Sequence, residues 1–241
     1  MDYTGKKFAD IASIIDRVVG NLKSEEPKPQ LEECDRREML RNTYKATSEI
    51  VQDCLADKYF HKRGIGELVY PASLRFAEKL RDGEGGIRPA IVAMIGVHGE
   101  DKPVSMHRTF LAPSGMSKAE MKAPRKIMPG GLPDGSCVML SDYHGGPIGI
   151  AEGIETAMSA SALYGIPVWA ALNATMLSRW TPPKDADEVV VFGDNDAKFG
   201  GQMAAYRCAH RAAVKGYKTY VNIPSNVGED WNDILLQKAD Q

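Results

Sequence analysis

Glu188–Asp196 has the sequence EVVVFGDND, in which an apolar run ends abruptly in glycine and carboxylates. The run has no polar alternation, which is typical of a parallel strand covered on both faces. Ligands of open parallel sheets bind beyond the carboxyl ends of the strands, where neighbouring connections diverge. Asp194 and Asp196 follow this strand directly, so we expect both carboxylates at a binding edge of a sheet.

A second apolar run ends in the same way. Ile148–Glu155 has the sequence IGIAEGIE, which places Glu152 just beyond a predicted strand. Carboxylates that lie close together repel one another, and at least one should have a raised pKa unless a cation neutralises them. Mg²⁺ prefers oxygen ligands and retains several waters, so we expect Mg²⁺ at this edge, with Mn²⁺ as an alternative.

The chain from residue 148 onward alternates between predicted strands and helices. We expect strands at 148–151, 168–172, 189–192 and 217–223, and helices at 154–164, 175–180, 201–215 and 230–238. Such alternation predicts a parallel sheet with right-handed crossovers. The late sequence GEDWND brings Asp230 and Asp233 to the same edge, although Asp230 equally fits the N-cap of the last helix.

Composition sets limits on the class of protein. With 241 residues, 43% of them hydrophobic, the chain can bury one substantial core and a smaller appendage. The net charge of −2 means that any nucleic-acid contact needs a local basic face. The four cysteines lack C-x-x-C spacing, which argues against a zinc ribbon and a disulfide framework. We expect a cytoplasmic protein, without a signal peptide or a membrane span.

The N-terminal half has mixed patterns. Helical spacing of apolar residues predicts a short helix at 8–19, a polar linker follows at 24–30, and the sequence from residue 31 to about residue 61 favours helix. Two apolar runs, 88–97 and 104–111, flank a turn and predict a β-hairpin.

A basic segment broken by proline and glycine follows the hairpin. It contains Lys118, Lys122, Arg125 and Lys126, and we expect no regular helix in it. Two interpretations are open: a solvated loop, or a basic rim that follows a phosphate backbone. His107 and Arg108 should project toward the same side if the hairpin packs against the acidic domain.

Three acidic motifs at successive strand ends carry a family resemblance: AEGIETA, FGDNDAKFGGQ and GEDWND. In this order they resemble the Toprim domain, the metal-binding module of bacterial-type primases, type II and IA topoisomerases and several nucleases. The resemblance covers roughly residues 148–236.

The preceding segments extend the resemblance to primases. Arg88-Pro89-Ala90, His107–Phe110 (HRTF), Pro124–Ile127 (PRKI) and the turn Lys62–Ile65 (KRGI) resemble the basic N-terminal subdomain of a primase catalytic core, as found in phages, plasmids and integrated elements. The resemblance implies an α/β fold with a Toprim-like parallel sheet flanked by helices. It divides the chain into a helical N-terminal segment (1–66), a small basic α+β subdomain (67–146) and a Toprim domain (147–241).

The resemblance also implies roles for individual residues. Glu152 matches the acid–base or metal-organising glutamate, Asp194 and Asp196 match the principal Mg²⁺ ligands, and Asp230 and Asp233 match further acidic positions. Basic positions that face template and nucleotide phosphates correspond to Arg88, Arg108 and Lys126, and we group Arg125 with them.

Two departures from the family pattern qualify the expectation. We recognise no zinc ribbon and no fused helicase in this sequence, so the resemblance implies a catalytic module without autonomous, sequence-selective priming. In addition, Ala197-Lys198-Phe199 precedes Gly200-Gly201 where glycine commonly follows the second aspartate directly.

Three functions are compatible with these observations. The leading hypothesis is synthesis of short RNA primers on single-stranded DNA from nucleoside triphosphates, with a helicase or a separate template-recognition protein as partner and no membrane contact. The alternatives are a Toprim nuclease and a non-catalytic module that docks on a replisome. The acidic cluster alone does not choose among them, because all metal-assisted phosphoryl transfer uses the same parts.

Overall fold

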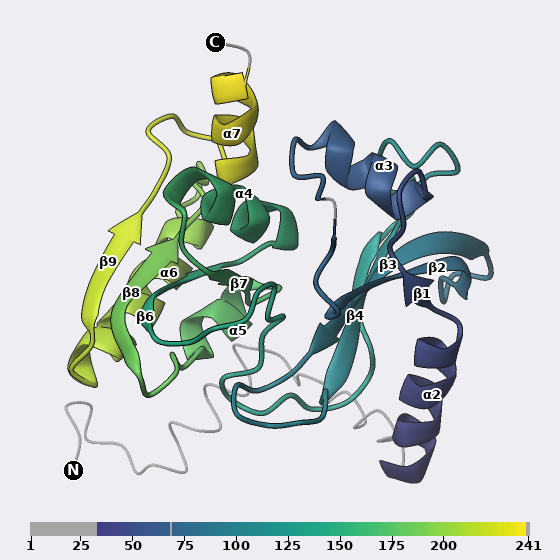
Figure 1. Ribbon diagram of the computed structural model, residues 1–241, viewed down its shortest axis with the longest axis horizontal. Coiled ribbons are helices and arrows are strands. Elements are labelled where there is room, and N and C mark those ends of the chain that lie inside the picture. The colour runs from purple at the N-terminus through teal and green to yellow at the C-terminus, as the bar shows by residue number, and fades with distance from the viewer. Residues whose placement is uncertain (1–32, 68, 240–241) are drawn as a thin grey trace, which may run out of the picture. The chain divides into compact units, whose positions relative to one another are not determined.

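The computed structural model describes residues 33–67 and 69–239, so the helix predicted at 8–19 and the linker at 24–30 lie outside the described residues. The described chain contains two sheets (Figure 1). One is a five-stranded antiparallel sheet with the order β1-β2-β3-β4-β5, and the other is a four-stranded parallel sheet with the order β7-β6-β8-β9. No helix in the described ranges is long and apolar enough to cross a bilayer.

The antiparallel sheet contains the predicted hairpin. Its strands are β1 (Ser48–Glu49), β2 (Leu74–Arg81), β3 (Ile87–Ile95), β4 (Ser105–Phe110) and β5 (Arg125–Ile127). The pairing of β3 with β4 confirms the hairpin, whereas β2 was not anticipated. The basic segment is not all loop, because β5 pairs with β4 and sets Arg125 opposite Thr109.

The helix expected from residue 31 to about residue 61 is interrupted. The structure instead has α2 (Glu33–Lys45) and α3 (Leu55–Lys62), with β1 between them. The Arg75 guanidinium donates to the hydroxyl of Thr47 at 2.7 Å and to its carbonyl at 3.2 Å, which secures the extended connection beside β2. The helix restarts after Cys54, whose Sγ accepts a hydrogen bond from the Asp57 backbone N–H.

Alternation along β4 and β5 divides the basic residues between two faces of the sheet. Successive side chains of a strand point to opposite faces, and paired residues share a face. His107 and Arg125 therefore lie on one face, and Arg108 and Lys126 lie on the other. The expectation that His107 and Arg108 project to the same side was wrong, because they are adjacent in one strand.

The parallel sheet has the predicted order of elements. These are β6 (Gly146–Ala151), α4 (Ile154–Tyr164), β7 (Val168–Ala170), α5 (Ala174–Arg179), β8 (Ala186–Phe192), α6 (Gly200–Val214), β9 (Lys218–Asn222) and α7 (Trp231–Ala239). All three pairings are parallel, as the alternation of strands and helices predicted. The resulting mixed α/β architecture confirms the expected fold class.

The central strand β8 is covered on both faces. Val189 and Val191 pack with residues of α5 and α6, whereas Val190 and Phe192 belong to the cluster that contains α4 and α7 (Figure 1). The hydrophobic cluster that contains Phe192 and residues of α4 and α7 also includes Ile91 and other residues of the antiparallel sheet. The two sheets therefore share one core. This shared core fixes the position of β5 relative to the carboxyl ends of β6 and β8.

Candidate active site

Acidic residues from three connections gather at the carboxyl ends of the central parallel strands. Ala151 of β6 pairs with Phe192 of β8, so the chain leaves both strands at the same level. Glu152 follows β6 immediately, and Asp194 lies two residues beyond β8. The register of two neighbouring strands therefore places the predicted carboxylates together.

Two glycines allow the turn after β8 to pack closely on α6. A Cβ atom on Gly193 would lie 2.8 Å from the Ala205 side chain, and one on Gly201 would lie 2.7 Å from the Asp194 carbonyl oxygen. Neither distance is compatible with a larger residue without movement of the turn. The glycines thus hold the Asp194 backbone against the start of α6.

Among these acids, Asp194 has the largest pKa shift. Burial, together with the negative charges of Asp230, Glu152 and Asp196, raises the pKa of its carboxyl to about 7 against the opposing charge of Arg125. Its Oδ1 atom is buried and has no hydrogen-bond partner among the described residues. A buried, unpartnered carboxylate oxygen beside other carboxylates is an unfavourable arrangement that a cation would relieve.

The other two predicted acids differ in environment. Burial raises the pKa of Glu152; the charge of Arg125 opposes this, and that of Asp196 adds to it. Asp196 is exposed, and its Oδ2 accepts a hydrogen bond from the Gly201 backbone N–H at 2.7 Å. Asp196 therefore caps the first turn of α6 and still presents its carboxylate to solvent.

Arg125 is the basic side chain that acts on this acidic cluster. Its charge lowers the pKa of both Glu152 and Asp194, although β5 belongs to the other sheet. The Arg125 guanidinium is solvent-exposed and forms no salt bridge within the described part of the chain. A free guanidinium facing a carboxylate cluster is suited to a phosphate that bridges the two.

The remaining predicted basic residues have other partners. Arg88 forms an ion pair with Asp82 at 2.9 Å, and the Lys126 ammonium binds Glu84 at 2.8 Å. Arg108 is partly buried on the α2 side of the sheet, where its guanidinium lies 5.7 Å from the ring centroid of Phe110. The structure thus separates Arg108 and Lys126 from Arg125 and does not group them along one track.

Asp230 and Asp233 form a capping box at the start of α7. Asp230 Oδ1 accepts from the backbone N–H groups of Asn232 at 2.8 Å and Asp233 at 3.0 Å. Asp233 Oδ2 in turn accepts from the Asp230 N–H at 3.0 Å. This reciprocal pattern is the N-cap alternative for Asp230. Asp230 also acts on Asp194 through its charge, whereas Asp233 is linked to the cluster only through its hydrogen bonds with Asp230.

A buried polar cluster beside the acidic edge was not predicted. Glu155, in the first turn of α4, accepts from the Tyr59 hydroxyl at 2.5 Å and pairs with the Lys118 ammonium at 2.9 Å. Burial alone would raise the pKa of Glu155, but Lys118 and Tyr59 lower it to about 2. His107, also buried, has its pKa lowered by burial to about 4. These contacts join α3, the segment after β4, and α4 directly behind Glu152.

The donor set fits a hard divalent cation that is only partly enclosed by protein. Among residues 33–67 and 69–239, no three His, Cys, Asp or Glu side chains form a ready-made metal cage. Mg²⁺ is commonly held by one or two carboxylates, with waters and substrate phosphates completing the octahedron. The unpartnered oxygen of Asp194 and the exposed carboxylate of Asp196 match that requirement.

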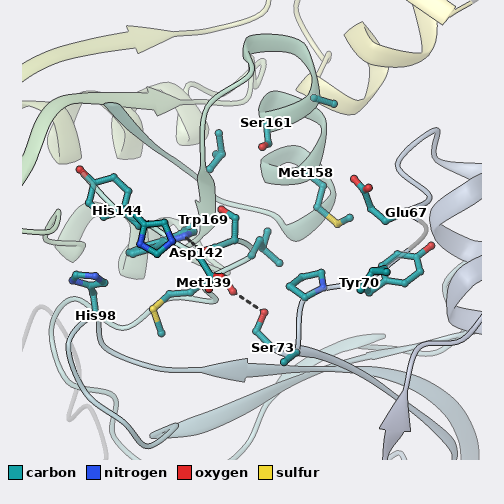
Figure 2. A pocket seen from close by; sticks show the side chains of 18 residues that line it. Glu67, Tyr70, Ser73, His98, Met139, Asp142, His144, Met158, Ser161 and Trp169 are labelled. Carbon is teal, nitrogen blue, oxygen red and sulfur yellow. Dashed lines mark hydrogen bonds between the residues drawn. The ribbon is translucent and has the colours of Figure 1, made fainter. Parts of the chain in front are cut away.

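A large pocket lies away from these carboxylates. It has a volume of about 860 Å³ and is lined by Tyr70, Ser73, His98, Trp169 and neighbouring residues (Figure 2). The Ser73 hydroxyl donates to the Met139 carbonyl at 2.6 Å inside it. Its lining from the parallel sheet includes Val168, the first residue of β7, whereas the acids follow the last residues of the strands. None of the predicted site residues lines this pocket.

Comparisons with known proteins agree with this architecture. Residues 147–241 match the Toprim domain family, and residues 34–140 match a domain of unknown function, DUF7146. No curated protein matches the sequence.

Three solved primase structures are similar to this chain. The DnaG primase catalytic domain bound to single-stranded DNA is 15% identical, with a TM-score of 0.53, and the match covers 85% of this chain and 79% of that one. The primase fragment of the bacteriophage T7 primase-helicase protein is 16% identical, with a TM-score of 0.49 over 76% of this chain and 66% of that one. A DNA primase domain from Pseudomonas aeruginosa is 13% identical, with a TM-score of 0.44 over 67% and 52%.

Proposed function

We propose that this protein, which carries a Toprim domain and has the fold of a primase catalytic domain, synthesises short RNA primers on single-stranded DNA by metal-dependent nucleotidyl transfer. One observation carries the proposal. The carboxylates of Glu152, Asp194 and Asp196 and the free guanidinium of Arg125 reach the same place from two different sheets. Phosphoryl transfer requires this combination of metal ligands and a cationic phosphate contact.

Asp194 and Asp196 are the proposed holders of Mg²⁺, with Mn²⁺ as a substitute. When bound, the ion would neutralise charge on the triphosphate oxygens and lower the pKa of a coordinated hydroxyl. Without a cation the Asp194 carboxyl is only about half ionised at neutral pH, because its pKa is raised to about 7. Metal binding should therefore release a proton from this site near neutral pH.

Glu152 is the proposed general base. In primer extension, a 3′-hydroxyl oxygen forms a bond to the α-phosphorus of a nucleoside triphosphate, the bond to the β-phosphate breaks, and pyrophosphate leaves. The hydroxyl proton must go to a nearby group. The pKa of Glu152 is raised by burial, which brings it closer to the range in which a carboxylate accepts a proton efficiently.

Arg125 is the proposed phosphate contact. It projects from β5 on the face that turns toward the parallel sheet, and its guanidinium is not neutralised by a protein carboxylate. In this position it would balance negative charge as pyrophosphate develops. It would also orient the triphosphate against the metal ligands.

A labelled-ribonucleotide assay tests the proposal. The full chain is incubated with single-stranded DNA, ribonucleoside triphosphates and Mg²⁺ or Mn²⁺, and the products are separated by length. We expect short labelled products that require template and metal and that vanish with Asp194→Asn. Asp233→Asn is the matched control, because Asp233 reaches the cluster only through its hydrogen bonds with Asp230, so the variant should keep activity.

The same assay separates the other hypotheses. A Toprim nuclease would shorten the DNA template without incorporating label, and a non-catalytic module would do neither. Either pattern, obtained with protein that binds divalent metal and single-stranded DNA, would refute primer synthesis. The helicase or template-recognition partner becomes testable once the basal activity on a bare template is known.

A further inference from the structure

One face of α6, together with the N-cap residue Phe199 that precedes it, exposes a row of large apolar side chains. Phe199, Met203 and Tyr206 have exposed fractions of 70%, 64% and 60%. Spacings of four and three residues place them along one side of the helix. We call these three residues the α6 stripe. The three tryptophans, by contrast, are at most 7% exposed and belong to the core.

Phe199 adopts a backbone conformation that phenylalanine normally avoids. Its φ is +61°, in the left-handed region, where a bulky residue is strained and glycine is not. Backbone hydrogen bonds fix it there: its N–H donates to Asp196 O and its carbonyl accepts from Met203 N–H, both at 3.0 Å. Strained residues cluster at functional sites. The chain therefore holds an exposed ring three residues from a proposed metal ligand at an energetic cost.

The surroundings of the α6 stripe are basic. Helix α6 (Gly200–Val214) contains Arg207, His210 and Arg211 and no acidic residue, and Lys198 and Lys215 flank it. The Asp196 carboxylate lies at the Phe199 end, where it caps the first turn of α6, and the helix beyond it carries only basic charges. Exposed rings with positive charge are complementary to single-stranded nucleic acid, which has apolar bases on a polyanionic backbone. A purely apolar protein partner would not require this charge.

We propose that the α6 stripe is a stacking surface for a single strand of nucleic acid that runs away from the acidic edge. Phe199 would contact the base nearest the metal ligands. Phe199 and Tyr206 are seven residues apart, which is about 10 Å along a helix axis. One DNA strand rises about 3.4 Å per nucleotide in a duplex, so the two rings match bases about three nucleotides apart.

The proposal rests on the proposed function only for the identity of the strand, and its test needs no catalysis. Binding of a fluorescent oligothymidylate to the full chain is measured by anisotropy, in EDTA and at several salt concentrations. The variants are Phe199→Gly, Tyr206→Ala and the double variant. Val51→Ala is the matched control, because Val51 is an apolar residue with 61% exposure outside α6.

Each ring variant should weaken binding by roughly 5- to 150-fold, the range for loss of one stacked base. The salt slope should stay unchanged, because no phosphate contact is lost, whereas Arg207→Gln should reduce it by about 0.7. Phe199→Gly should melt no lower than the parent, because glycine adopts the left-handed conformation without strain. Weaker binding by a variant that is at least as stable cannot be attributed to unfolding.

Wild-type affinity in the double variant, or an equal loss with Val51→Ala, would overturn the proposal and leave the α6 stripe as a face for a protein partner. The outcome is independent of the primer assay. Weaker binding by the ring variants of a protein that makes no primers would support the stripe and refute the proposed function alone. Unchanged binding with primer synthesis intact would refute the stripe alone.

Discussion

Replacing Asp194 with asparagine should stabilise the metal-free protein at pH 8 and should stabilise it much less at pH 4.5. The pKa of Asp194 is raised from 3.8 to about 7 in the folded state. Between these values the folded chain holds a proton that the unfolded chain has released, so stability falls as pH rises. The protonated Asp194 carboxyl stabilises the parent protein fully below the unfolded pKa, and this stabilisation is lost once the pH passes the folded pKa.

The magnitude follows from the pKa difference. About 3 pKa units correspond to about 4 kcal/mol at 1.36 kcal/mol per unit. Solvent screens a carboxyl that is not fully buried, so we expect the free energy of unfolding of Asp194→Asn to exceed that of the parent by about 2 kcal/mol at pH 8. For a chain of this size, that difference raises the melting temperature of Asp194→Asn by about 4–8 °C.

Urea denaturation of the two proteins in EDTA, from pH 4.5 to 8.5, measures the difference directly. The free energies of unfolding should diverge steadily from the lowest pH of this range to about pH 7 and run parallel above pH 8. Adding Mg²⁺ at pH 8 should stabilise the parent more than the variant, by about 2.7 kcal/mol at 100 times the dissociation constant. A difference between the proteins that does not change with pH would refute the assigned electrostatic state of Asp194.

Three further predictions concern the surrounding residues. Arg125→Gln should weaken oligonucleotide binding and reduce the salt slope by roughly 0.7, whereas Lys126→Gln on the other face should leave the slope unchanged; equal slopes in anisotropy titrations would contradict the division of faces. Glu152→Gln should keep most Mg²⁺ affinity by calorimetry and lose turnover by roughly 10²–10⁴-fold, and loss of metal binding would make Glu152 a primary ligand instead. Lys118→Met should lower the free energy of unfolding by roughly 3 kcal/mol, because it leaves Glu155 buried without its ammonium partner. Adding Glu155→Leu to Lys118→Met should recover much of the lost free energy of unfolding, measured by urea denaturation. If the double variant is no more stable than Lys118→Met, the proposed ion pair between Lys118 and Glu155 would be contradicted.

The parallel sheet and its acidic edge were predictable because their signals are local. The run at Val189–Phe192 specifies a buried strand by itself, and the glycine and aspartates that follow mark its end. Parallel pairing of the two strands then brings the residues that follow their carboxyl ends, Glu152 and Asp194, to one edge of the sheet. The same locality explains why every helix and strand after residue 146 was anticipated.

The basic side of the site was not predictable in the same way. Whether Arg125 or Lys126 faces the acids depends on the pairing of a three-residue strand in a segment rich in proline and glycine. A shift of one residue in that register would exchange the two side chains. The Lys118–Glu155 pair likewise joins a loop to a helix through tertiary packing. The only sequence signal for it is a second glutamate three residues after Glu152.

The location of the metal tests the central claim most directly. Crystals of the full chain grown with Mn²⁺ and a nucleoside triphosphate would reveal the ion by its anomalous scattering. We predict a peak about 2.0–2.2 Å from carboxylate oxygens of Asp194 and Asp196, with the triphosphate between the ion and the Arg125 guanidinium. A nucleotide-bound structure in which the ion lies elsewhere, or in which Arg125 turns away from the phosphates, would contradict the account.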